Sequence, residues 1–127
     1  MNYLLSDMLI RIKNGYVSKK INVVVRHSYF CVKVLEMLYS HGFINGYFII
    51  GNNAVVKLKY YQNDHVFKNL NIVSKPGRRI YCSVKEIKKK YYYKNFVLVS
   101  NKYGIMTHRE SITNNCGGEV LFTLNYS

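Results

Sequence analysis

The chain has 127 residues, enough for one compact domain or two small lobes, and 49% of them are hydrophobic, enough for a buried core. Nineteen Lys and Arg residues against six Asp and Glu give a formal net charge of +13. A charge this high favours a protein that binds a polyanion such as nucleic acid over one whose surface charge only keeps it soluble. No apolar run is long enough to cross a bilayer, and three cysteines without a C-x-x-C pair speak against a disulfide scaffold and for a reducing compartment.

The first half of the chain carries two helical patterns around a short strand. Apolar residues recur at helical spacing over residues 4–12, which predicts a first helix that stops at Asn14-Gly15. The β-branched run Val23-Val24-Val25 predicts a strand that ends at Arg26. Ser28 can then cap a second helix that ends before Gly42. An apolar run, a Gly-Asn-Asn turn and an alternating strand up to residue 61 predict a hairpin.

After residue 62 the pattern changes to short strands, expected near residues 70–73, 80–83, 96–100, 104–107 and 119–124. We expect a single helical turn in this half, either after Thr107 or at residues 84–87. The sequence therefore predicts an α+β fold. An N-terminal helix–strand–helix–hairpin lobe, residues 1–62, packs against a C-terminal mostly β lobe, residues 63–127.

A basic turn, Lys75-Pro76-Gly77-Arg78-Arg79, is a candidate RNA contact. Proline fixes φ and glycine can take a positive φ, so the backbone of the turn is already ordered and little conformational entropy is lost when its cations bind. Guanidinium groups suit phosphate oxygens, although an exposed hairpin with incidental charge has the same composition. Tyr81 follows directly, and it fits a base-stacking residue and an ordinary strand residue equally well.

Residues 85–94 combine lysines and tyrosines, a composition that a stacking and phosphate-binding groove shares with a solvated helix or loop surface. Further on, Ser100-Asn101-Lys102-Tyr103-Gly104 offers hydroxyl, amide and ammonium groups between two apolar strands. In residues 115–119, the pair Gly117-Gly118 lets another backbone approach closely, and Glu119 could accept hydrogen bonds from base amino groups. Taken by themselves, both segments also read as structural loops.

Catalytic and metal-binding patterns are missing from the sequence. The four histidines are scattered, without metal-ligand spacing to the cysteines, and the six acidic residues form no pair suited to acid–base chemistry. Neither of the two glycine-rich phosphate-binding motifs, G-x-x-x-x-G-K-[ST] and G-x-G-x-x-G, occurs in the sequence. We expect no catalytic residue, metal, cofactor, small-molecule substrate or membrane partner. Besides a structural RNA-binding protein, the alternatives are a DNA-binding or RNA-chaperone module, an enzyme and a membrane-surface binder, the last two disfavoured.

The amino-acid usage indicates a genome rich in A and T. Lys, Asn, Tyr, Ile and Phe supply 58 of the 127 residues, while Ala and Pro occur once each. Amino acids with A/T-rich codons are therefore abundant, as in an organelle or a reduced bacterium.

Five ordered motifs resemble the bacterial-type small-subunit ribosomal protein S8 family. They are SDMLIRIKNG at residues 6–15, VLEMLYSHGFI at residues 34–44, VSKPGRRIY at residues 73–81, GIMTHRE at residues 104–110 and GGEVL at residues 117–121. Each motif is weak alone, but their order and spacing together are specific and span nearly the whole chain.

The resemblance implies a protein of the small-subunit platform that binds the central domain of the small-subunit ribosomal RNA and contacts neighbouring ribosomal proteins. It also implies which residues bind RNA. These are Lys75, Pro76, Gly77, Arg78, Arg79, Tyr81, Ser100, Asn101, Lys102, Tyr103, Gly104, Thr107, Gly117, Gly118 and Glu119, with a secondary contact from Arg11, Lys13 and Asn14.

The chain departs from the family pattern in the loop at residues 100–104. Asn101, Lys102 and Tyr103 replace a threonine, a serine and a basic residue, so larger donors stand where small hydroxyls fit a base-edge pocket. His108 and Ile112 replace a frequent acid and a frequent basic residue. With the A/T-rich usage and a helix that begins within five residues of the start, this divergence predicts an organelle-encoded protein of the mitochondrial ribosome in the matrix, with a plastid or bacterial cytoplasm as alternatives.

Overall fold

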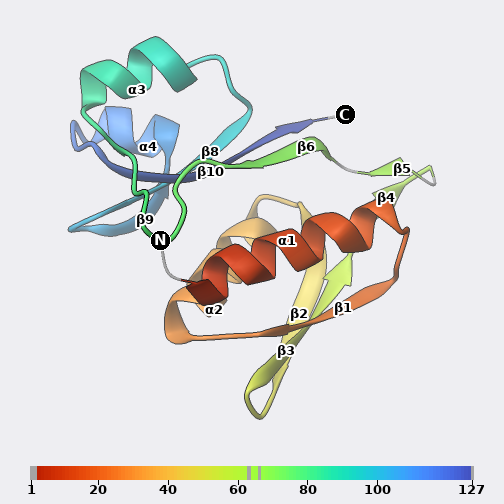
Figure 1. The fold of residues 1–127 in the computed structure, drawn as a ribbon. Helices are drawn as coiled ribbons and strands as arrows, with labels where there is room; N and C mark the ends of the chain where they lie inside the picture. Colours follow the sequence, from red (N-terminus) through yellow and green to blue (C-terminus); the bar gives the residue numbers. More distant parts are fainter. Residues whose placement is uncertain (1–2, 63, 66, 127) are drawn as a thin grey trace. The chain divides into compact units, whose positions relative to one another are not determined.

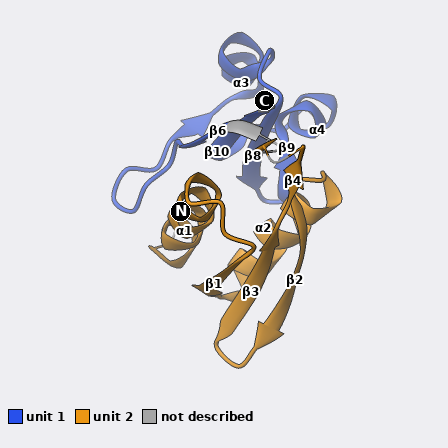
Figure 2. Cartoon of the chain, turned by 90° about the vertical axis from the view of Figure 1, so that its right-hand side faces the viewer, with its two compact units in different colours: residues 1, 67–127 blue, residues 2–66 orange. Residues whose placement is uncertain are grey.

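The computed structural model describes residues 3–62, 64–65 and 67–126. The chain divides into two compact units, Asn2–Val66 (orange in Figure 2) and Phe67–Ser127 (blue). Both units combine helices with antiparallel strands, which confirms the α+β class. The lobe boundary expected between residues 62 and 63 stays a prediction, because Asn63 lies outside the described residues.

The N-terminal unit is the helix–strand–helix–hairpin arrangement that the sequence predicts (Figure 1). Its three-stranded antiparallel sheet has the order β1-β3-β2. A separate two-residue ladder joins β4 and β5. The elements are α1 (Tyr3–Val17), β1 (Asn22–Arg26), α2 (Tyr29–Ser40), β2 (Ile44–Ile50), β3 (Asn53–Leu58), β4 (Tyr60–Tyr61) and β5 (Asp64–His65).

Helical periodicity accounts for the core of this unit. α1 buries Leu5, Met8, Leu9 and Ile12, which recur every three or four residues. Each such side chain, fully buried, contributes about 1.5–3 kcal/mol of transfer free energy. The predicted cap of α2 is confirmed, since the Ser28 hydroxyl accepts from the backbone N–H of Cys31 at 3.4 Å.

The predicted end of α1 at Asn14-Gly15 is wrong, because the helix continues to Val17. Gly15 is needed for packing instead: a Cβ there would overlap the Val23 side chain on β1. The helix ends without a glycine, as Lys19 adopts a left-handed φ of 55°. The N–H of Lys20 then donates to the carbonyl of Gly15 at 2.9 Å.

The C-terminal unit contains a five-stranded antiparallel sheet in which β10 pairs with three neighbours. β10 lies between β6 and β8, β9 follows β8 at one edge, and β7 pairs with the beginning of β10. The elements are β6 (Phe67–Ile72), β7 (Tyr81–Cys82), α3 (Val84–Tyr91), β8 (Phe96–Asn101), β9 (Gly104–Thr107), α4 (His108–Thr113) and β10 (Gly118–Tyr126).

Two helices form here, where the sequence predicted a single turn at one of two places. α3 begins with a capping box: the Ser83 hydroxyl accepts from the Glu86 N–H at 3.2 Å, and the Glu86 carboxylate accepts from the Ser83 N–H at 3.2 Å. Ile87 of α3 packs in a core cluster with strand residues such as Val97 and Val120, and Ile112 of α4 packs against that cluster. None of the helices in the described part of the chain could span a membrane.

Candidate nucleic-acid interface

The Pro-Gly turn has the geometry of a type II turn. Pro76 and Gly77 are its central residues, and Gly77 has a φ of 80°, which this turn type requires at its third position. The N–H of Arg78 donates to the Lys75 carbonyl at 2.8 Å, and the Lys75 N–H donates back to the Arg78 carbonyl at 3.0 Å. Lys75, Arg78 and Arg79 are exposed, so the turn presents three cations to solvent.

Ser74 anchors this turn to the sheet. Its side chain is fully buried; the hydroxyl donates to the Val120 carbonyl at 2.6 Å and accepts from the Ile80 N–H at 3.0 Å. The Val120 N–H donates to the Ile80 carbonyl at 2.9 Å. Both ends of the turn are therefore held on the beginning of β10, and sequence reasoning did not single out Ser74 because its role depends on a strand 46 residues away.

Three predicted site residues lie opposite one another on adjacent strands. Glu119 of β10 pairs with Tyr81 of β7 on one side and with Ser100 of β8 on the other. Tyr81 is exposed, and Ser100 and Glu119 are half-buried. Together with the turn, these residues form what we call the basic edge: Lys75 to Arg79, Tyr81, Ser100 to Gly104, and Gly118-Glu119. The structure thus brings the predicted segments of the C-terminal unit together.

The glycine pair allows a close backbone approach, but the backbone that approaches is the protein's own. A Cβ on Gly117 would overlap the Cys82 carbonyl, and a Cβ on Gly118 would overlap the Ser100 carbonyl. The same added atom on Gly118 would lie 2.9 Å from the Asn101 Cβ. The two glycines let β10 enter between β7 and β8, and so they position Tyr81 and Ser100.

The β8–β9 loop is braced from within by Asn101. Its side-chain oxygen accepts from the Tyr103 N–H at 2.9 Å, and its amide donates to the Met106 sulfur at 3.4 Å. Lys102 and Tyr103 are exposed, with the lysine ammonium 5.1 Å from the tyrosine ring centre. The loop therefore projects one cation and one aromatic ring, while Asn101 holds its shape.

Thr107 differs from its neighbours because it is buried. Its hydroxyl caps α4, accepting from the Glu110 N–H at 3.2 Å and donating to the Glu110 carboxylate at 3.1 Å. The side chain orients α4 against β9. A direct RNA contact by Thr107 stays a prediction.

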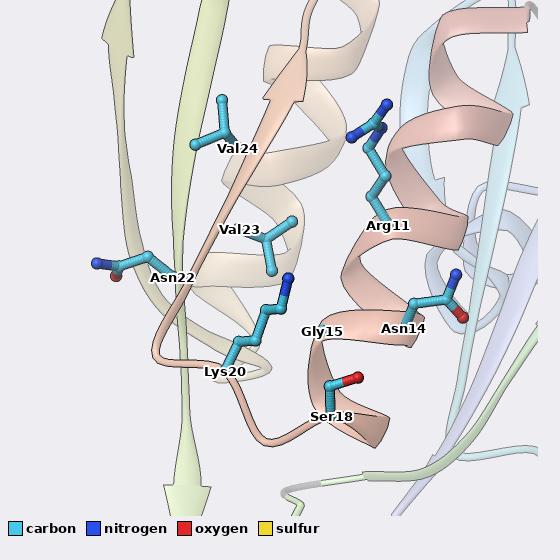
Figure 3. A pocket seen from close by; sticks show the side chains of 8 residues that line it. All are labelled: Arg11, Asn14, Gly15, Ser18, Lys20, Asn22, Val23 and Val24. Atoms are coloured by element: carbon cyan, nitrogen blue, oxygen red, sulfur yellow. The ribbon is translucent and has the colours of Figure 1, made fainter.

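The secondary residues Arg11, Lys13 and Asn14 lie in the other unit, exposed on α1. Arg11 donates to the Asp7 carboxylate at 3.0 Å. Figure 3 shows a pocket of about 470 Å³ beside this part of α1, lined by Arg11, Asn14, Gly15, Ser18, Lys20, Asn22, Val23 and Val24. Sequence reasoning did not place Ser18, Lys20 and Asn22 beside Arg11 and Asn14, because it ended the helix at Asn14-Gly15.

The titratable groups near the basic edge do not suggest acid–base chemistry. Burial raises the pKa of the Cys82 thiol, which keeps it neutral beside Gly118. Among the described residues, no group of three or more His, Cys, Asp or Glu side chains could hold a metal ion. The arrangement can bind phosphates and base edges.

Comparisons with known proteins agree over nearly the full length. The Ribosomal protein S8 family model matches residues 4–124. The small ribosomal subunit protein uS8m of Acanthamoeba castellanii is 37% identical over 125 residues, which cover 96% of this chain and 98% of that protein. The small ribosomal subunit protein uS8 of Rickettsia canadensis is 39% identical over 121 residues, covering 91% and 92% respectively. That of Neorickettsia sennetsu is 34% identical over 126 residues.

Proposed function

This chain belongs to the ribosomal protein S8 family, and we propose that its C-terminal unit binds the central domain of the small-subunit ribosomal RNA through the basic edge. As a member of that family, it is a structural component of the small ribosomal subunit, associated with ribosomal RNA and ribosomal proteins, and is not an enzyme. We further propose that its binding supports assembly of the subunit platform and thereby translation.

One observation supports this proposal most: the cationic turn, the β8–β9 loop and the beginning of β10 adjoin on neighbouring strands. Glu119 is paired with both Tyr81 and Ser100, and Ser74 ties the turn to the next residue of β10. A single folded RNA strand could therefore contact all three segments at once. Because the segments are held by backbone hydrogen bonds, little of the site has to be ordered on binding.

The side chains of the basic edge divide into two roles. Lys75, Arg78, Arg79 and Lys102 are suited to phosphate oxygens, which position the RNA without reading its sequence. The Ser100 hydroxyl and the Glu119 carboxylate are suited to base edges, and the exposed ring of Tyr81 to stacking. Pro76, Gly77 and Gly104 shape the turn and the loop.

The remaining proposed contacts act through position or charge. Tyr103 projects from the loop, whereas Asn101, Thr107, Gly117 and Gly118 act chiefly by fixing the backbone that meets the RNA. In the N-terminal unit, we propose a secondary electrostatic contact from exposed residues of α1, namely Arg11, Lys13 and Asn14.

We assign the protein to the mitochondrial ribosome in the matrix. The A/T-rich residue usage supports this assignment, and so does the similarity to the mitochondrial uS8m of Acanthamoeba castellanii. The bacterial relatives, such as that of Rickettsia canadensis, make a bacterial cytoplasm the alternative.

Two substitutions separate the proposed roles. Arg79→Ala should weaken binding of a central-domain RNA fragment about equally for cognate and mutated sequences, and should reduce the salt slope by about 1. Ser100→Ala should lower discrimination between those sequences by about fivefold, the value of one hydrogen bond worth about 1 kcal/mol. Filter binding of both variants to the same RNA pair measures these effects.

Lys33→Ala is the matched control, because Lys33 is exposed on α2 in the other unit. If Arg79→Ala and Ser100→Ala bind both RNAs as tightly as the control does, the basic edge is not the RNA site. Co-sedimentation with small subunits in moderate salt tests the ribosomal setting, since a free nucleic-acid module would remain in the supernatant.

A further inference from the structure

A second basic surface lies on α3 and the residues that follow it. We call it the lysine–tyrosine surface: Lys85, Lys88, Lys89, Lys90, Tyr92 and Tyr93, all exposed. In Figure 1, α3 and the segment after it lie above β10, whereas the turn after β6 and the end of the β8–β9 hairpin lie below β10. The basic edge therefore does not include this surface.

The orientation of α3 is fixed at both ends. The capping box of Ser83 and Glu86 holds its beginning, and Ile87 is fully buried in the core cluster. Tyr91 packs partly buried against the same cluster. The lysines are therefore presented on the solvent-exposed surface of a folded helix, rather than on a loose tail.

The charge of this segment is not balanced locally. Residues 84–94 contain five lysines and one acid, Glu86. Hydrogen bonds from Ser83 lower the pKa of the Glu86 carboxyl, and the same bonds commit the carboxylate to the cap. Lys88 to Lys90 lie in the last turn of α3, where cations interact favourably with the negative end of the helix dipole. This interaction accounts for the lysines but not for the exposed aromatic rings.

The two tyrosines form an exposed aromatic platform. Tyr93 is 90% exposed and Tyr92 is 53% exposed, and neither contributes to the core. Their ring centres are 5.4 Å apart with an interplanar angle of 88°, an edge-to-face contact. The exposed rings follow the exposed lysines of α3 closely in the chain. Cations combined with exposed aromatic rings are how proteins bind single-stranded nucleic acid.

We propose that the lysine–tyrosine surface is a second RNA-binding surface that takes an unpaired strand, with lysines on the phosphates and tyrosines stacked on bases. This inference rests on the proposed function, because it assigns a further RNA segment to the same partner. RNA is favoured over an acidic protein segment because bases offer ring faces to Tyr92 and Tyr93, whereas carboxylates would use the lysines alone.

The first test uses the full chain with a central-domain RNA fragment that carries a single-stranded flank. The variant K88Q/K89Q/K90Q is compared with K19Q/K33Q/K57Q, which removes the same charge from exposed residues of the other unit. We expect the α3 variant to lower the salt slope by about 2, from three single-strand phosphate contacts, and the control to change it much less. Equal slopes for the two variants would overturn the proposal.

The second test isolates stacking. The pair Y92A/Y93A should bind a labelled oligouridylate roughly 5- to 100-fold more weakly than the unmodified chain, whereas Y92F/Y93F should bind it as the unmodified chain does. Fluorescence anisotropy measures both pairs, and retained binding of the central-domain fragment shows that each variant is folded. Unchanged oligouridylate binding by Y92A/Y93A would refute the platform.

The two proposals fail differently. If K88Q/K89Q/K90Q binds RNA as the control does while Arg79→Ala weakens binding, the second surface is absent and the basic edge stands. If Arg79→Ala has no effect while the α3 variant weakens binding, the proposed function at the basic edge fails instead. Should the α3 variant lose only a neighbouring ribosomal protein in reconstituted subunits, the surface binds protein and the inference is wrong.

Discussion

His108 is a buried histidine at the first position of α4, with 1% of its surface exposed. Neither ring nitrogen has a hydrogen-bond partner of ordinary geometry among the described residues, but the backbone of Tyr92, Lys94 and Val97 faces the ring and opposes part of the lowering of its pKa. Burial lowers the pKa of the imidazole from its ordinary value of 6.5, and the charge of Arg109 acts in the same direction. The folded protein therefore holds this ring neutral at a pH where the unfolded chain protonates it.

This histidine predicts a loss of stability in acid. Above pH 6.5 the ring is neutral in both states and has no effect; below that value the unfolded chain binds the proton more tightly, so unfolding becomes more favourable. The loss at pH 5 is at most about 2 kcal/mol, because 1.5 pH units correspond to about 1.36 kcal/mol each. Urea unfolding of the unmodified chain and of His108→Leu, at pH 7 and pH 5, measures it. An equal change in both proteins between the two pH values would contradict this assignment.

Asn101 illustrates how far residue types alone specify a site. The sequence places an amide at the loop where a small hydroxyl is usual, which suggests a larger donor toward RNA. In the structure that amide bonds to the Tyr103 N–H and the Met106 sulfur of its own hairpin. A side chain's partners depend on the backbone around it, so its chemistry was predictable and its direction was not.

At the scale of elements, the beginning of β10 determines the geometry of the basic edge. It enters between β7 and β8, where no room is left for a Cβ on Gly117 or Gly118. The sequence marks this place as a pair of glycines, and it cannot tell whether an RNA backbone or a protein backbone takes the space. The paired strands show that the protein's own carbonyls do.

Gly118→Ala should destabilise the protein by about 1–3 kcal/mol, since the added methyl group overlaps a backbone carbonyl that cannot rotate away. It should also weaken RNA binding at temperatures where the variant is folded, because Ser100 must shift. Gly51→Ala, in the other unit, is the control. Gly51 has a φ of 57° and nothing lies within 4 Å of an added Cβ, so this substitution strains the backbone without causing an overlap. Chemical denaturation and filter binding compare the two variants. If Gly118→Ala is as stable and binds RNA as tightly as the unmodified chain, β10 and β8 can move apart easily and the prediction is wrong.

The helices show where local signals succeed and fail. Ser28 was predictable as a cap because its hydroxyl acts within three residues. α1 was predicted too short, since Asn14-Gly15 is a common stop and the packing of Gly15 against Val23 is a long-range contact. For α3 and α4 the sequence predicted a single turn at one of the two places. α3 is longer because Ile87 and Tyr91, at helical spacing, both pack on the core of the unit.

At the scale of the whole molecule, the formal net charge of +13 predicts strongly salt-dependent binding. If about six phosphates are neutralised, the logarithm of the association constant should fall against the logarithm of salt concentration with a slope of about −4 to −5. Titrations of the central-domain fragment between low and moderate salt measure this slope. A slope near zero would mean that charge does not drive the association.

The sequence by itself determined the α+β class, the order of most elements, the preference for a polyanionic partner and the family, because periodicity, caps, net charge and motif order are local or additive properties. Only the tertiary structure decided that Ser74 ties the Pro-Gly turn to β10, that Glu119 lies between Tyr81 and Ser100, and that Asn101 is turned inward. Those contacts join residues that are far apart in the chain or depend on the exact path of a loop, and sheet register rather than residue type creates them.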